Sequence, residues 1–87
     1  MTLREKHRRL KLYYPGDYTI VILLVGSKGY VFDRDAAVCA GIAPLRELLQ
    51  VYSLTPARIK FPKDQVGEVN RLLVANGHRA IVCDKAR

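Results

Sequence analysis

The sequence predicts a small α/β (α+β) domain in which about three helices pack on a mixed β-sheet of four to five strands. One observation is the apolar run YTIVILLV at residues 18–25, which has no polar alternation. A second is the helical spacing of apolar residues near both ends of the chain. The elements follow the order α-β-β-α-(β)-β-α-β, with the bracketed strand left open. At 87 residues, the whole chain 1–87 is expected to form one domain.

A helix is predicted at the start of the chain, because Thr2 and Glu5 have the spacing of a capping box. The apolar stripe of this helix is formed by Leu3, His7, Leu10 and Tyr14. The helix is expected to end before residues 15–17, Pro-Gly-Asp, since proline disfavours a helical conformation in the residue before it. The three tyrosines around this junction, Tyr13, Tyr14 and Tyr18, are expected to be core residues.

Residues 19–25 then form a strand that is covered on both faces. The segment 26–29, GSKG, is expected to be a tight turn with Lys28 at its tip, and residues 30–32 form the returning strand of a hairpin. Asp33 is expected to cap a short helix over residues 34–40, which Gly41 closes.

The second half of the chain is harder to assign. Residues 43–50 fit either a helix or a loop, residues 50–54 fit a strand, and residues 58–61 alternate basic and apolar side chains as an exposed edge strand does. A last helix begins around residues 62–64 and ends at Asn76-Gly77. Its buried face is expected to be Val66, Val69, Leu72 and Leu73. Residues 80–83 are expected to form a short buried strand.

The formal net charge is +7, and five of the fifteen cationic residues fall within the first twelve positions. Such an excess suggests an anionic partner, most simply nucleic acid, because neutralised phosphates release counterions. The alternative is a generally basic surface that keeps the protein in solution.

Neither membrane insertion nor a metal site is predicted. The apolar run is too short for a membrane helix, and no small-residue cleavage site follows it. We therefore expect a soluble, cytoplasmic protein. Cys39 and Cys83 lack the paired spacing of zinc ligands and are expected to be buried free thiols in a reducing compartment, with a disulfide as the alternative.

Three groups of residues are candidates for contacts with DNA. Ser27, Lys28 and Tyr30 belong to the hairpin, where a phosphate could meet Lys28 and a base or sugar could stack on Tyr30. Arg4, Arg8 and Lys11 share one face of the first helix. Arg58, Lys60 and Lys63 form the third group. The alternatives are an ordinary hairpin, a solvated helix face and charges that protect an edge strand from aggregation.

No enzyme activity, metal or cofactor is predicted. Neither His7 nor His78 has a nucleophile placed beside it by a motif. Asp33, Asp35 and Asp64 could suggest a metal site, but Asp33 and Asp64 are explained as acids at helix starts. The segment GSKG lacks the pattern of a phosphate-binding P-loop.

Taken in order, the segments RRLKLYYP, ILLVG, VFDRDAA and FPKDQVGEVNRLLVANGHRAIVCDKA resemble the N-terminal mismatch-recognition domain (domain I) of the MutS family. That family grips DNA through a Phe-x-Glu pair at the hairpin. Alignment on Gly26 and on residues 32–36 places Lys28 at the phenylalanine and Tyr30 at the glutamate, so the pair is not kept. The resemblance implies a DNA-facing platform without the mismatch-reading residues.

The function expected from these observations is a small non-enzymatic domain that binds DNA, duplex or single-stranded, mainly by electrostatics and with weak sequence selectivity. The alternative is an accessory module derived from the same fold that binds a protein partner, or a second copy of itself, through the edge strand 58–61.

Overall fold

The four strands of the sheet are ordered β3-β2-β1-β4, from Arg58–Pro62 through Lys28–Phe32 and Thr19–Val25 to Arg79–Asp84. In this computed structural model, which describes residues 1–84, β1 pairs antiparallel with β2 and parallel with β4, and β2 pairs antiparallel with β3. The predicted α+β domain with a mixed sheet is therefore confirmed. Residues 85–87, which the single-domain prediction includes, lie outside the described residues.

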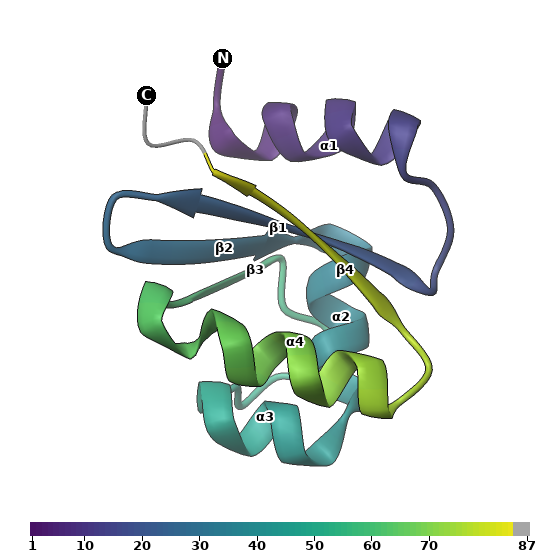
Figure 1. Ribbon diagram of the computed structural model, residues 1–87, viewed down its shortest axis with the longest axis vertical. Helices are drawn as coiled ribbons and strands as arrows, with labels where there is room; N and C mark the ends of the chain where they lie inside the picture. Colours follow the sequence, from purple (N-terminus) through teal and green to yellow (C-terminus); the bar gives the residue numbers. More distant parts are fainter. Residues whose placement is uncertain (85–87) are drawn as a thin grey trace.

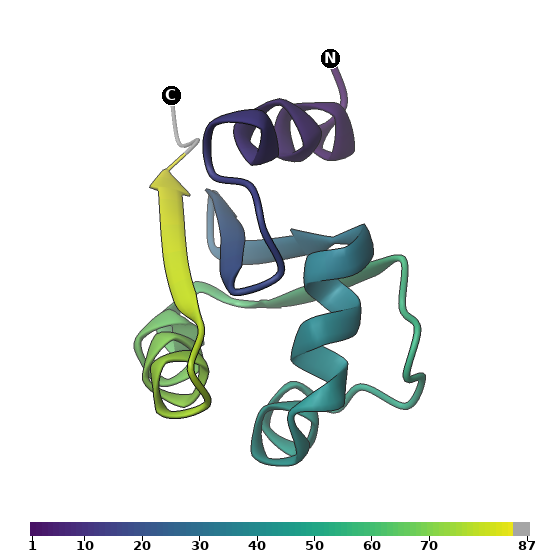
Figure 2. The same ribbon diagram turned by 90° about the vertical axis from the view of Figure 1, so that its right-hand side faces the viewer.

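Helices lie on both faces of the sheet (Figures 1 and 2). The first helix, α1 (Leu3–Tyr13), covers one face alone. Three helices pack on the other face: α2 (Asp33–Gly41), α3 (Ala43–Leu49) and α4 (Val66–Ala75), the last preceded by the 3-10 turn η1 (Lys63–Gln65). The central strand β1 is covered on both faces, as its uninterrupted apolar sequence predicted, and Ile20 to Leu23 have no exposed surface.

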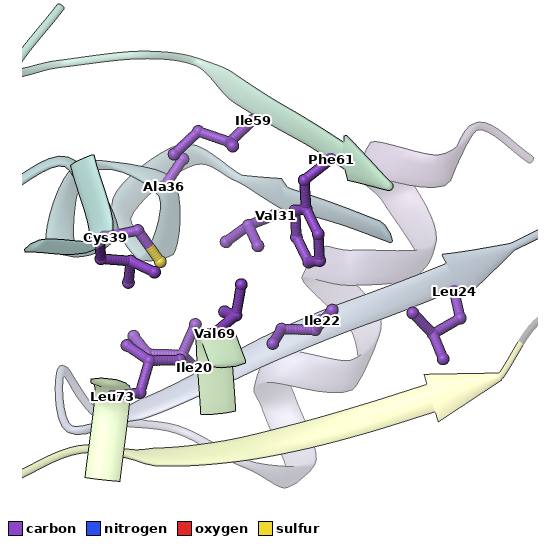
Figure 3. Packing of buried hydrophobic residues seen from close by; sticks show 11 residues of the cluster. Ile20, Ile22, Leu24, Val31, Ala36, Cys39, Ile59, Phe61, Val69 and Leu73 are labelled. Atoms are coloured by element: carbon purple, nitrogen blue, oxygen red, sulfur yellow. The ribbon is translucent and has the colours of Figure 1, made fainter. Parts of the chain in front are cut away.

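The larger core lies between the sheet and helices α2, α3 and α4 (Figure 3). Ile59 and Phe61 point from β3 toward Val31 of β2, and Val69 and Leu73 reach the same core from α4. The smaller core lies under α1, where Leu3, Leu10 and Tyr14 pack against Val21, Leu23 and Phe32. The predicted buried faces of the first and last helices are thus confirmed.

Several local predictions hold. Thr2 and Glu5 form the capping box of α1, with the Glu5 amide 3.1 Å from Thr2 Oγ1 and the Thr2 amide 2.9 Å from Glu5 Oε1. Residues 43–49 are helical, and the edge strand expected at 58–61 is β3. The thiols Cys39 and Cys83 are both free, but only Cys39 is buried as expected, because Cys83 lies half-buried on the edge strand β4.

Other predictions were wrong. No strand forms at residues 50–54, because Gln50 ends α3 with a φ of 53° and the segment then runs over the surface, with Tyr52 94% exposed. The closing strand β4 is a half-buried edge and is not a buried strand, because among the strands of residues 1–84 only β1 pairs with it.

The tyrosines at the helix–strand junction and the acid before α2 also differ from expectation. Tyr13 and Tyr18 are 80% and 72% exposed, and of the three tyrosines only Tyr14 packs against the smaller core. Asp33 makes no side-chain cap to α2, since its carboxylate faces the arginines of α1 instead.

Candidate functional site

The pleat of strands β2 and β3 divides their side chains between the two faces of the sheet. Ile59 and Phe61 of β3 are buried in the larger core, so Arg58 and Lys60 must point to the opposite face, where both are exposed. On β2, Val31 belongs to the larger core and Tyr30 to the smaller one. The cations of β3 therefore share the α1 side of the sheet with Tyr30.

The register brings these residues together in pairs. Tyr30 lies opposite Lys60, Phe32 opposite Arg58, and Lys28 opposite Pro62. Directly opposed residues on one face have Cβ atoms about 4.5–5.5 Å apart. We call the set Lys28, Tyr30, Arg58 and Lys60 the β2–β3 strip. Within residues 1–84, none of its three cations forms an ion pair.

One end of the strip meets the start of α1. The guanidinium of Arg4 lies 5.9 Å from the centre of the Phe32 ring, and Arg4 Nη2 donates a hydrogen bond of 3.4 Å to the Ala57 carbonyl. The Tyr30 and Phe32 rings are nearly parallel, with centres 6.2 Å apart. A hollow of about 490 Å³ opens here, lined by Thr2, Leu3, Arg4, Phe32, Ala57 and Arg58. Cationic and aromatic side chains are thus continuous from this hollow along β2.

The other end of the strip lies at the hairpin turn. The two turn residues are Gly26 and Ser27, because Val25 pairs with Lys28. Only Gly26 of these two has a positive φ, 59°, as a type II′ turn requires of its first central residue. The expectation that Lys28 stands at the tip was therefore wrong: it is the half-buried first residue of β2.

The turn also borders η1, where the Lys63 amide donates to the Ser27 carbonyl at 2.8 Å. A hollow of about 640 Å³ lies there, lined by Ser27, Lys28, Pro62, Lys63, Asp64 and Val66. Lys63 Nζ is 4.0 Å from the Asp84 carboxylate, and Asp64 adds a negative charge to the lining. Ser27, Lys28 and Lys63 are thus brought together, but with acids beside them.

The basic face predicted on the first helix is turned toward acids of α2. Arg4 Nε and Arg8 Nε lie 3.4 and 3.6 Å from the two carboxylate oxygens of Asp33. Lys11 Nζ lies 3.1 Å from Asp35 Oδ1 and donates to the Thr19 carbonyl at 2.6 Å. Glu5 is the one acid in the sequence of the first helix, and the acids that face its cations come from a different element, α2.

A buried polar cluster, which the sequence did not reveal, joins α1, β1 and α2. The Val21 amide donates to Asp35 Oδ2 at 2.9 Å, and His7 Nε2 donates to the Val21 carbonyl at the same distance. Two positions further along the β1–β2 register, Phe32 would lie opposite Val21, but β2 ends at Phe32 and the chain enters α2. Asp35 and His7 therefore form hydrogen bonds with the Val21 amide and carbonyl, which have no strand partner on the β2 side.

The electrostatics of this cluster keep the acid ionised. Burial alone would raise the pKa of Asp35, but hydrogen bonds from His7, from the Val21 amide and from Lys11 outweigh it and lower that pKa. Asp35 and His7 are both 2% exposed. The cluster is saturated by its own partners, which indicates a structural role. One feature of the sequence could have revealed this buried cluster: the carboxylate of Asp35 is followed by Ala36-Ala37, on a helix that has to pack against an apolar strand.

Two other reactive side chains, Cys39 and His78, are held by packing and by ring stacking. Burial raises the pKa of Cys39 to about 12, and the charge of Asp35 adds to this, so the thiol stays protonated. His78 stacks on Tyr18, with ring centres 5.6 Å apart. Across residues 1–84 there is no group of three His, Cys, Asp or Glu side chains that could hold a metal ion. None of the described helices has the length and apolar character needed to cross a membrane.

Comparison of the chain with protein families, with curated proteins and with solved structures finds no significant match. The resemblance to MutS domain I therefore stays a prediction made from the residues.

Proposed function

We propose that this protein is a small, non-enzymatic DNA-binding domain and that the β2–β3 strip is its main contact surface. The observation that supports this most directly is the position of Lys28, Arg58 and Lys60. These cations share one face of two paired strands and have no ion pair within residues 1–84. Cations that the protein does not neutralise itself are available to phosphates.

The other predicted contact residues have smaller parts in the proposal. Arg4 borders the strip, but it forms an ion pair with Asp33. Arg8 is also paired with Asp33. Lys11 is held by Asp35 and by backbone carbonyls of the chain. Ser27 and Lys63 lie at the turn end of the strip, next to Asp64 and Asp84. We therefore assign Arg8 and Lys11 to packing of the fold and the strand cations to DNA, with Arg4 at the border between the two groups.

The test compares two variants that remove the same number of charges. In Arg58→Gln/Lys60→Gln both substitutions fall on the strip. The matched control, Arg9→Gln/Arg79→Gln, removes one exposed cation from α1 and one from the opposite edge strand β4. Binding of labelled DNA is followed by fluorescence anisotropy over a range of salt concentrations.

The strip variant should bind more weakly, and its plot of log K against log salt should be flatter by about 1.8 on duplex DNA, or about 1.4 on a single strand, for two lost phosphate contacts. The control should keep the wild-type slope. Equal effects of the two variants would show that only net charge matters and would remove the strip from the proposal. Absence of binding to any DNA at low salt would remove DNA binding itself.

A second candidate function follows from the place of β3 at the edge of the sheet. An added strand from a partner protein, or from a second copy, could pair with its outer edge. Arg58, Lys60 and Pro62 on the same strand are residues that discourage such pairing, which is why we place this function second. Light scattering after size-exclusion chromatography would favour it if the protein is a dimer whose mass and stability do not change with DNA.

A further inference from the structure

We infer that the β2–β3 strip accepts a single-stranded polynucleotide in preference to a duplex, with one unpaired base on Tyr30 and its neighbouring phosphates on Lys60 and Arg58. This inference rests on the proposed function and names the form of its ligand. It depends on the aromatic side chain that lies among the cations, which phosphate binding alone would not use.

The position of Tyr30 carries the first step. Tyr30 is half-buried and stands directly opposite Lys60, so one aromatic ring and one cation lie side by side on the same face. In a duplex, the faces of each base are occupied by its neighbours in the stack. In a single strand a base can be turned out and can stack on an aromatic side chain. Tyr30 therefore adds affinity only for an unpaired base.

The dimensions of the strip carry the second step. It is two strands wide, and neighbouring strands lie about 4.8 Å apart. On the β1 side it is bounded by α1, which packs over Val21, Leu23 and Phe32. On the other side it reaches the free edge of the sheet at β3. A narrow track between a helix and an edge suits one chain of nucleotides.

The hollow beside Phe32 provides room for the next nucleotide. It begins two residues along β2 from Tyr30, a distance of about 6.6 Å at the rise of a β-strand. Phe32 is itself only 5% exposed beneath Arg4, so its ring is not open to a base, but two of the residues that line the hollow, Arg4 and Arg58, carry guanidinium groups. Planar guanidinium groups can stack on bases as well as pair with phosphates.

The experiment titrates the full chain with one labelled oligonucleotide of about 12 nucleotides, a length within the site sizes of single-strand binders. The same sequence is offered as single-stranded DNA, as single-stranded RNA and as the matched DNA duplex at one salt concentration. Either single strand should bind at least about fivefold more tightly than the duplex. The ratio of the DNA and RNA affinities identifies which polynucleotide the strip prefers.

Substitutions of Tyr30 separate stacking from charge. Tyr30→Leu keeps an apolar side chain but should lower single-strand affinity about tenfold, while Tyr30→Phe keeps the ring and should retain it. Duplex binding should change little in either variant. The matched control is Tyr13→Leu, which alters a tyrosine that is 80% exposed on α1 and outside the strip.

Proton NMR on the unmodified protein tests the stacking on Tyr30 without any substitution, so the test does not depend on whether a variant folds. On addition of the single strand, the ring protons of Tyr30 should shift upfield, as expected beneath a stacked base, while those of Tyr13 should stay in place. A duplex that binds as tightly as the single strand, or a Tyr30 signal that does not move on saturation, would overturn the inference and leave electrostatic DNA binding intact. Failure of every oligonucleotide to bind would instead overturn the proposed function.

Discussion

Asp35 has three partners from two other elements: the Val21 amide of β1 donates a hydrogen bond to it, and His7 Nε2 and Lys11 Nζ of α1 lie 3.4 and 3.1 Å from its carboxylate oxygens. A carboxylate that is 2% exposed would be costly to ionise without these partners. Because they are present, the ionised acid fixes the angle at which α2 leaves β2 and also holds α1 on the sheet. One side chain thereby links three elements that are distant in sequence.

Replacing Asp35 with Asn should destabilise the fold by about 3 kcal/mol, because it leaves Lys11 without its anionic partner. Urea unfolding followed by circular dichroism measures this loss. The control Asp17→Asn removes an acid from the exposed pair with Arg34 and should cost under about 1 kcal/mol. Equal losses in the two variants would contradict the structural role of the buried cluster.

The same acid should make the fold sensitive to low pH. Its pKa is lower in the folded state than its ordinary value, so its stabilising contribution is complete above about pH 4, the ordinary range of an Asp, and is lost as the pH falls through the folded pKa. Glu5 and Glu68 also have lowered pKa values, from hydrogen bonds with Thr2 and Arg71. The free energy of unfolding should therefore fall below pH 4 in the natural protein, and Asp35→Asn should show a smaller fall.

Gly29 is required by a close approach to Phe61. A Cβ at position 29 would lie 2.6 Å from Phe61 Cζ and 2.7 Å from Cε2, and the ring is buried in the larger core. Gly29→Ala should destabilise the protein by about 1–3 kcal/mol, as overpacking does. Gly67→Ala, at an exposed position of α4 with open space around it, should stabilise by about 0.5–1 kcal/mol. Thermal unfolding of the two variants distinguishes the positions, and a neutral Gly29→Ala would show that Phe61 can move.

At the scale of elements, α1 combines a local capping signal with long-range docking. Its capping box needs only residues within one turn, which is why it could be predicted from Thr2 and Glu5. Its docking depends on Asp33, Asp35 and the strand backbone, all of which come from elsewhere in the chain. The spacing of residues therefore predicted the bounds and the apolar face of α1. It did not show that Asp33 and Asp35 of α2 lie beside its cationic face.

Thr2→Ala should destabilise the protein by about 1 kcal/mol through loss of the cap of α1, and Thr2→Ser should restore most of this. Chemical denaturation measures both changes. Hydrogen exchange locates them: faster exchange of amides in the first turn of α1, with β1 unchanged, is the expected pattern. A loss as large with serine as with alanine would show that the threonine methyl group matters more than the hydroxyl.

The segment at residues 50–54 shows how an apolar pattern can mislead. Val51, Tyr52 and Leu54 have the composition of a strand, yet Tyr52 and Leu54 are 94% and 65% exposed. The outer side of β2 is already paired with β3, and residues 51–57 connect α3 to β3 over the surface without forming a strand. Composition alone carries no record of which edges are occupied.

At the scale of the whole molecule, the fold sorts the cations into two classes. Arg4, Arg8 and Lys11 of α1 lie beside Asp33 and Asp35, and the cations of β2 and β3 remain without ion pairs within residues 1–84. The unpaired positive charges behind the net charge of +7 are therefore distributed unevenly over the surface. This sorting is why the proposed contact surface lies on the strands, although the first helix holds the densest run of basic residues.

The two thiols should report on opening of the whole fold. Cys39 has no exposed surface and a pKa raised to about 12, whereas Cys83 is half-buried on the edge strand β4. With a thiol reagent at neutral pH, Cys83 should react first and Cys39 only at the rate of global unfolding. Mass spectrometry follows each site. Denaturant should accelerate the modification of Cys39 in parallel with the loss of the circular dichroism signal. Early modification of Cys39 in the native protein would contradict this prediction.

The sequence by itself determined the elements whose signals are local: the capped first helix, the buried strand β1, the hairpin, the edge strand β3 and the last helix. These depend on periodicity, caps and turn residues that act within a few positions. Only the tertiary structure decided which cations are neutralised, where Lys28 stands, and that Tyr30 faces Lys60. The physical reason is that ion pairs and strand register join residues far apart in the chain, and their energies depend on distances that spacing along the sequence does not contain.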